Sequence, residues 1–118
     1  MKIVILTEGG KGIGSGHLVR CLALYQAFTK MGIEPMFVVN KRRTNLGFLK
    51  LNRVKDIRAY SLNRLLKMLG PDDILVIDSY LISKDFYNKV SKRVRLLVSI
   101  DDLGRIRYPK GVVLNGSI

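Results

Sequence analysis

His17, the only histidine of the chain, follows a glycine-rich stretch and is the residue best suited to do chemistry. Glycines occupy positions 9, 10, 12, 14 and 16. Because glycine has no Cβ, the backbone of Gly14 and Gly16 could let a ligand approach closely. An imidazole beside such a loop can serve as a general base. The alternative is a structural role, which is the commoner one for a lone histidine.

A strand and a helix must hold this loop in place. Residues 3–6 form a continuous β-branched and aliphatic run, which is typical of a strand covered on both faces. Beyond the histidine, apolar residues recur at helical spacing: Leu18, Cys21, Leu22, Tyr25 and Phe28. The free N–H groups and positive dipole end of such a helix would suit an anion or a developing negative charge.

The rest of the chain alternates between strand and helix patterns. Strand-like runs cover residues 36–39, 57–60, 74–77, 94–100 and 112–114, and helices are expected to begin near residues 44, 61 and 83. This alternation predicts an α/β protein with a doubly wound parallel sheet, Rossmann-like, and helices on both faces. We expect residues 1–118 to form a single domain.

Polar residues collect directly after the predicted strands. They are Glu8, Asn40, Asp78, Asp101, Asp102 and Asn115. In open α/β sheets, ligands bind beyond the carboxyl ends of the strands, so this shared edge predicts a binding site. Each residue could singly be a turn former or a helix cap. The three aspartates could form a magnesium site, whereas one histidine and one cysteine do not make the usual transition-metal site.

Composition limits the partners and the compartment. The net charge is +12, from 21 lysines and arginines against 9 acidic residues, and much of the excess lies between Lys41 and Lys67. Such a balance favours polyanionic partners, although a solvated, lysine-rich surface has the same composition. Cys21 is the only cysteine and is expected to be buried and inert. With no secretory signal pattern and no apolar run of roughly 20 residues, we expect a cytoplasmic protein without a membrane span.

Two common nucleotide-binding motifs do not fit the glycine-rich stretch. The dinucleotide fingerprint GxGxxG finds no register between Gly9 and Gly16. A phosphate loop needs a serine or threonine directly after its lysine, and Lys11 is followed by Gly12. These mismatches argue against NAD binding and against P-loop hydrolysis.

Three segments resemble the motifs of one nucleotide-sugar enzyme family. Residues 12–24 (Gly-Ile-Gly-Ser-Gly-His-Leu-Val-Arg-Cys-Leu-Ala-Leu) resemble its G-x-G-H-x-x-R-C-x-x-L-A signature. Residues 75–80 (Leu-Val-Ile-Asp-Ser-Tyr) are similar to its V-D-x-Y segment, and residues 98–103 and 112–117 match in register. The family contains the UDP-sugar hydrolases of pseudaminic acid synthesis and the spore coat polysaccharide biosynthesis proteins of the SpsG type. Residues 7–10 look closer to the spore coat branch, because an aspartate is usual at position 8 in the other branch.

The resemblance implies a two-domain GT-B-type enzyme of surface polysaccharide biosynthesis, with this chain as its N-terminal, sugar-facing domain. The histidine that matches His17 is then the base for a water molecule that attacks the anomeric carbon of a UDP-sugar. The tyrosine that matches Tyr80 helps to order that water, and UDP leaves without a metal ion or another cofactor. In this fold a C-terminal domain holds most of the nucleotide, so the chain would need a second domain or a partner chain.

The remaining site residues are predicted to bind the substrate: Gly14, Gly16, Arg20, Asp78, Asp101 and Asn115. The glycines would allow close backbone approach, the arginine would orient the site or offset phosphate charge, and the other three would be scaffold residues or contact sugar hydroxyl groups. We also expect the histidine to face the glycine loop and to pack little. The alternative function is a non-enzymatic, basic α/β module that binds nucleic acid through residues 41–67, a partner that the resemblance does not favour.

Overall fold

The computed structural model describes residues 1–8, 16–40, 46–79, 82–101, 108–109 and 111–114. Within these residues the chain forms a parallel sheet of six strands in the order β3-β2-β1-β4-β5-β6. The strands are β1 (Ile3–Thr7), β2 (Met36–Asn40), β3 (Ile57–Tyr60), β4 (Ile74–Asp78), β5 (Leu96–Ile100) and β6 (Val112–Leu114). The predicted doubly wound, Rossmann-like α/β fold is confirmed.

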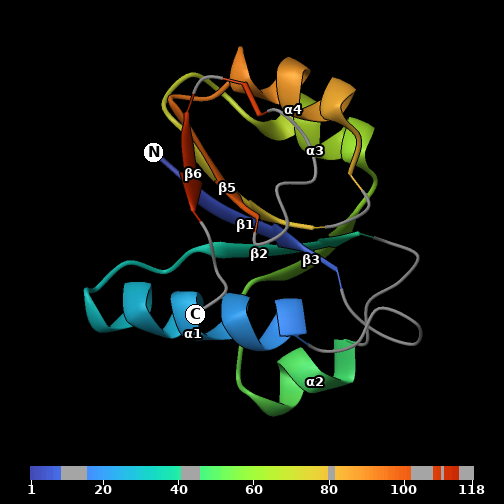
Figure 1. Ribbon diagram of the computed structural model, residues 1–118. Coiled ribbons are helices and arrows are strands. Elements are labelled where there is room, and N and C mark those ends of the chain that lie inside the picture. Colours follow the sequence, from blue (N-terminus) through green and yellow to red (C-terminus); the bar gives the residue numbers. More distant parts are fainter. Residues whose placement is uncertain (9–15, 41–45, 80–81, 102–107, 110, 115–118) are drawn as a thin grey trace.

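Four helices in the described part of the chain cover the sheet from both sides. They are α1 (Gly16–Lys30), α2 (Leu46–Leu51), α3 (Leu62–Met68) and α4 (Lys84–Ser91). Figure 1 shows α1 and α2 below the sheet and α3 and α4 above it. The expected starts of the last two helices near residues 61 and 83 are confirmed, because Ser61 and Ser83 are the N-caps and accept from the backbone N–H groups of Arg64 and Phe86.

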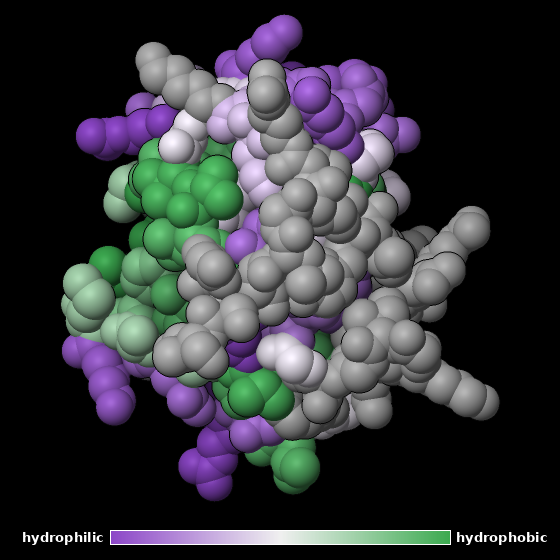
Figure 2. Space-filling model, viewed as in Figure 1, coloured by the Kyte–Doolittle hydropathy of each residue, from purple (hydrophilic) through white to green (hydrophobic). Residues whose placement is uncertain are grey.

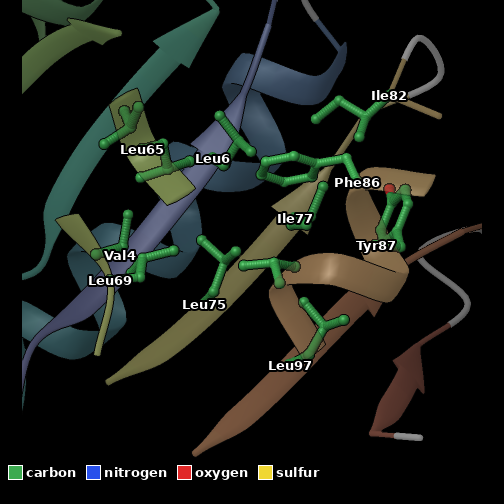
Figure 3. Packing of buried hydrophobic residues seen from close by; sticks show 12 residues of the cluster. Val4, Leu6, Leu65, Leu69, Leu75, Ile77, Ile82, Phe86, Tyr87 and Leu97 are labelled. Atoms are coloured by element: carbon green, nitrogen blue, oxygen red, sulfur yellow. The ribbon is translucent and has the colours of Figure 1, made fainter. Parts of the chain in front are cut away.

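The two faces of the sheet bury alternate residues of the same strands. Val4, Leu6, Leu75, Ile77 and Leu97 lie under α3 and α4, as Figure 3 shows for one of the two core clusters. The intervening Ile5 and Val76 belong to the cluster that packs against α1. Side chains alternate along a strand, so a strand buried on both faces must be apolar at every position. This is why the sequence pattern of β1 and β4 was unambiguous.

The end of α2 and the start of β5 have local causes, and the start of β5 differs from the sequence-based expectation. Helix α2 ends at Leu51, because Arg53 takes a left-handed conformation (φ 60°) and Val54 N–H donates back to Leu49 O at 3.2 Å. Strand β5 begins at Leu96 rather than at residue 94, because the N–H groups of Arg93 and Val94 both donate to Val90 O after α4. The apolar residues at these helix ends pack on the core without continuing an element.

The strand order reverses between β1 and β4. From β1 the chain adds β2 and β3 on one side, and it then returns to add β4, β5 and β6 on the other. The two central strands pair in register, with Thr7 opposite Asp78 at their carboxyl ends. Such a reversal leaves a crevice between the diverging loops, which is where doubly wound sheets bind ligands. Asp78, one of the residues predicted for the site, lies at this edge of the sheet.

The sixth strand forms one edge of the sheet and carries exposed apolar side chains. Val112, Val113 and Leu114 are 41%, 51% and 48% exposed, and Figure 2 shows apolar atoms gathered where β6 lies in Figure 1. On the α1 side, an apolar groove of about 670 Å³ runs between β6, β5 and the flank of α1, lined by Leu24, Phe28 and Val98 among others.

The chain approaches β6 through a glycine in close contact with its neighbour strand. Gly111 has φ 155°, and a Cβ added to it would stand 2.5 Å from the carbonyl oxygen of Leu97. Real Cβ atoms do not come this close to a backbone oxygen. Strand β6 can therefore pair with β5 at this distance only because position 111 has no side chain.

None of the described helices combines the length and the apolar character that crossing a membrane requires.

Candidate active site

His17 lies in the first turn of α1 and is buried against the carboxyl end of β4. Its side chain is 4% exposed, and its Nδ1 lies 2.5 Å from Oδ1 of Asp78. The expectation that this side chain packs little is therefore wrong. Helix α1 begins at Gly16, so its first turn carries the ring and packs it against the end of β4 instead of leaving it in the loop. The histidine and the aspartate, 61 positions apart in the sequence, form one buried pair.

Asp78 is the point on which three side chains of α1 converge. Arg20 donates from Nε to Oδ2 and from Nη2 to Oδ1, both at 2.7 Å, and the Sγ of Cys21 lies 3.7 Å from Oδ2. Positions 17, 20 and 21 lie on the same face of a helix, so one helical turn supplies all of these contacts. This bidentate contact orients the carboxylate and also neutralises its charge. The roles predicted for Arg20 in substrate binding stay predictions.

The carboxyl group of Asp78 is ionised at neutral pH despite its complete burial. Burial by itself would raise the pKa of Asp78, but the hydrogen bonds and charges of His17 and Arg20 outweigh it and hold this pKa below its usual range. An ionised carboxylate can only accept hydrogen bonds, so the proton in the contact with His17 belongs to Nδ1. In the neutral ring, Nε2 is then the nitrogen with the lone pair.

Cys21 is part of this cluster, but its thiol is unreactive. Burial, followed by the charge of Asp78, raises the pKa of its thiol, so the nucleophilic thiolate is strongly disfavoured. The side chain is fully buried on the face of α1 that packs against the sheet. The sequence-based prediction of a buried, inert thiol is confirmed.

A second set of buried polar contacts joins the ends of β1 and β4. Thr7 Oγ1 donates to the carbonyl oxygen of Asp78 at 2.9 Å, and Ser79 Oγ donates to the carboxylate of Glu8. All four residues are at most 1% exposed. Sequence reasoning noted Glu8 but missed Ser79, although its place directly after a buried strand at the predicted ligand edge was the signal that could have found it.

The other predicted site residues are placed only in part. Gly16 is the exposed first residue of α1, and a Cβ added there would meet no atom within 4 Å, so its backbone borders open space. Asp101 is buried after β5, one strand away from Asp78, and its N–H donates to Leu114 O at 2.8 Å. Gly14, Tyr80 and Asn115 lie outside the described residues.

Metal binding finds no support in the part of the chain that the structure describes. No group of three or more histidine, cysteine, aspartate or glutamate side chains there is placed to hold an ion. Asp102, which the conceivable magnesium site would need, lies outside the described residues.

The basic region between residues 41 and 67 is partly visible and partly engaged in local contacts. Arg58 donates to the hydroxyl group of Tyr60 at 3.0 Å, and the guanidinium of Arg64 lies 4.5 Å from the centre of the same ring. Residues 41–45, which hold three of its basic side chains, lie outside the described residues. Nothing in these contacts selects a polyanionic partner.

Comparisons with known proteins give two distant similarities. The chain is 28% identical over 105 residues to the uncharacterized protein MJ1062 of Methanocaldococcus jannaschii, an alignment that covers 86% of this chain and 22% of that protein. It is 28% identical over 119 residues to the pseudaminic acid cytidylyltransferase and UDP-2,4-diacetamido-2,4,6-trideoxy-beta-L-altropyranose hydrolase of Helicobacter pylori, covering 98% of this chain and 20% of that protein. The chain spans about a fifth of the length of these relatives. No protein-family model and no solved structure matches it.

These similarities relate the chain distantly to an enzyme of the pseudaminic acid pathway. They agree with the resemblance of the sequence motifs to enzymes of pseudaminic acid synthesis. The closer resemblance to the spore coat branch stays a prediction.

Proposed function

We propose that this chain is the base-carrying domain of an enzyme that hydrolyses a UDP-sugar in surface polysaccharide biosynthesis. The observation that carries the proposal is the buried His17–Asp78 pair, held by Arg20 at the crevice where the strand order reverses. The distant similarity to a protein named in part as a UDP-sugar hydrolase supports the substrate class.

The buried pair supplies what a general base needs. Asp78 fixes the tautomer of the imidazole, so Nε2 is the atom that can take a proton, and the carboxylate stabilises the imidazolium that then forms. Arg20 donates to both carboxylate oxygens, one of which also contacts His17, and so limits the rotation of the carboxylate. A positioned base of this kind typically contributes about 10²–10⁴-fold to a rate.

In the proposed reaction, His17 activates a water molecule for attack on the anomeric carbon of the sugar. The water oxygen forms a bond to that carbon, one water proton passes to Nε2, and the bond from the anomeric carbon to the diphosphate oxygen breaks. UDP leaves with the electron pair, and the proton returns to solvent from the imidazolium. Transfer of the sugar to another hydroxyl group would use the same steps with that hydroxyl in place of water.

The rest of the proposed machinery comes from residues that the motif resemblance assigns. Tyr80 would order the attacking water, the backbone at Gly14 and Gly16 would lie against the substrate, and Asp101 and Asn115 would contact sugar hydroxyl groups. A second, nucleotide-binding domain, facing this one as in GT-B enzymes, would hold the UDP. The isolated chain is accordingly expected to bind UDP poorly and to be inactive.

The first test needs no activity, because His17 is the only histidine. Nitrogen-15 NMR of the imidazole in the isolated chain should show that Nδ1 carries a proton. A ring protonated only at Nε2 would contradict the geometry from which the base was assigned.

The second test measures turnover in a protein that joins this chain to a nucleotide-binding domain. His17→Asn keeps an N–H group near the position of Nδ1, so the contact with Asp78 can survive while the base is lost. We expect kcat for UDP-sugar hydrolysis to fall about 10²–10⁴-fold with a smaller change in KM. Leu22→Ala is the control, because it should cost about 2–5 kcal/mol of stability without altering the chemistry of folded molecules. Full turnover with asparagine at position 17 would refute the role of His17.

A further inference from the structure

Glu8 and Ser79 form a buried cluster that the proposed reaction does not use. Ser79 Oγ donates to the Glu8 carboxylate and accepts from the backbone N–H of Ile82 at 3.2 Å. All three residues are at most 1% exposed. The cluster therefore ties the end of β1 to the segment that follows β4, on either side of the crevice.

Each member of the cluster lies next to a part of the proposed site. Glu8 directly precedes the glycine-rich stretch that leads to His17, and Ser79 directly follows Asp78. The peptide bond that joins Asp78 to Ser79 is held as well, because Thr7 Oγ1 donates to the Asp78 carbonyl oxygen at 2.9 Å. A carboxylate whose backbone is fixed in this way has little freedom to turn away from the imidazole.

The burial of this cluster has an energetic cost that its hydrogen bonds must offset. A carboxylate that is fully removed from water is costly unless hydrogen bonds or charges stabilise it. The Ser79 hydroxyl both donates and accepts, so it couples the Glu8 side chain to the main chain of the segment after β4. Losing either side chain leaves a buried polar group without one of its partners.

We infer that Glu8 and Ser79 are positioning residues, which hold Asp78 in the orientation that His17 requires. The consequence for catalysis rests on the proposed function, whereas the geometric effect on His17 does not. Glu8 acts through Ser79, and Ser79 acts through the backbone of the next residue, Asp78. A displacement of about 1 Å in a catalytic group can lower a rate about 10²-fold, so this indirect support matters for turnover.

The direct readout is the Nδ1–H proton of His17 in NMR spectra of the chain, which no other histidine can obscure. We expect Glu8→Ala and Ser79→Ala to shift this signal and to speed its exchange with water by about tenfold or more. Glu8→Gln keeps the side-chain length and an acceptor oxygen, so it should retain most of the wild-type signal. Ser99→Ala is the matched control, since it removes the hydroxyl of another buried serine, in the middle of β5.

Turnover separates this inference from the proposed function. In a protein that includes the nucleotide-binding domain, Glu8→Ala should lower kcat about 10–100-fold while KM stays within about twofold. An Nδ1–H signal in Glu8→Ala and Ser79→Ala that changes no more than in Ser99→Ala would overturn the positioning role. If the signal changes as expected but the wild-type protein does not hydrolyse UDP-sugars, the proposed function fails and the positioning role stands. Should Glu8→Ala not fold, Ser79→Ala decides, because it removes only one hydroxyl group.

Discussion

Strand β4 has a buried carboxylate at each end, and the two are held in different ways. Asp73, before its first residue, accepts from the backbone N–H groups of Lys2 and Gly70, both at 2.9 Å. Asp78, its last residue, accepts from the side chains of His17 and Arg20. Asp73 lies near the surface and Asp78 lies deeper, yet hydrogen bonds hold the pKa of both below the usual range against the effect of burial.

Under the proposed function, the difference between the two ends separates a structural carboxylate from one that serves a site. Backbone N–H groups cannot titrate, so Asp73 fastens the N-terminus and the turn after α3 to the sheet. An imidazole can take and release a proton, so Asp78 would orient the proposed base. A lowered pKa of an aspartate is thus no sign of function by itself. The kind of partner is what distinguishes the two.

The largest difference should appear in turnover. In the assembled enzyme, Asp78→Asn should lower kcat about 10²–10⁴-fold, because an amide no longer fixes the imidazole tautomer. Asp73→Asn should leave kcat of folded molecules within about twofold. Steady-state kinetics of the two variants make the measurement, and equal losses would mean that the comparison is wrong.

The next difference is in stability. Asp78→Asn removes the carboxylate from a pair with Arg20, which is 26% exposed, so we expect a loss of about 2–4 kcal/mol, somewhat less than for a fully buried pair. Asp73→Asn weakens hydrogen bonds from main-chain donors and should cost about 1–3 kcal/mol. Urea denaturation of the isolated chain gives both values. A larger loss for Asp73→Asn would reverse the order that we derive from burial.

The pH dependence of stability should reveal both carboxylates. Because the pKa of each is lower in the folded state than in the unfolded state, their stabilisation is complete above the unfolded value of about 3.9 and is lost as the pH falls below it. Urea midpoints measured from pH 6 to pH 3 should therefore decrease, and either asparagine variant should flatten the decrease. Leu75→Ala, within the same strand, should lower the urea midpoint by the same amount at every pH, so that the dependence on pH is unchanged.

The smallest effect concerns the ammonium group near Asp73. The Nζ of Lys2 lies 3.4 Å from Asp73, but the lysine side chain is 46% exposed. Lys2→Ala keeps the backbone N–H that binds the carboxylate, so the loss should be at most about 1 kcal/mol. A loss as large as that of Asp73→Asn would show that the side chain, rather than the backbone, holds this end of the strand.

Much of the fold and the place of His17 could be predicted because they depend on local patterns. An apolar run such as Ile3–Leu6 specifies a strand, and the stripe from Leu18 to Phe28 specifies a helix, whatever surrounds them. Because parallel strands share one carboxyl edge, the polar residues that follow them could also be placed together.

The pairing of His17 with Asp78 could not be predicted in the same way. It depends on β1 and β4 pairing directly, and hydrophobic patterns indicate which strands are buried at the centre but not which of them pair. It could not be predicted either that Asp73 is buried rather than the adjacent Asp72. The choice depends on where the start of the chain places the backbone N–H of Lys2. Spatial neighbours decide which polar residue of a pattern becomes structural.

Strand β6 has a consequence for how mutational scans of this protein should be interpreted. Gly111 has no side chain that could take part in chemistry, yet any side chain there would press on the carbonyl oxygen of Leu97 and force the two strands apart. The side chains that are tolerated at this position would show how far β5 and β6 can move apart. A scan scored only by loss of activity would group substitutions at Gly111 with those at His17 and Asp78. A parallel measurement of protein abundance would distinguish the loss of folded protein at Gly111 from the loss of chemistry at the other two positions.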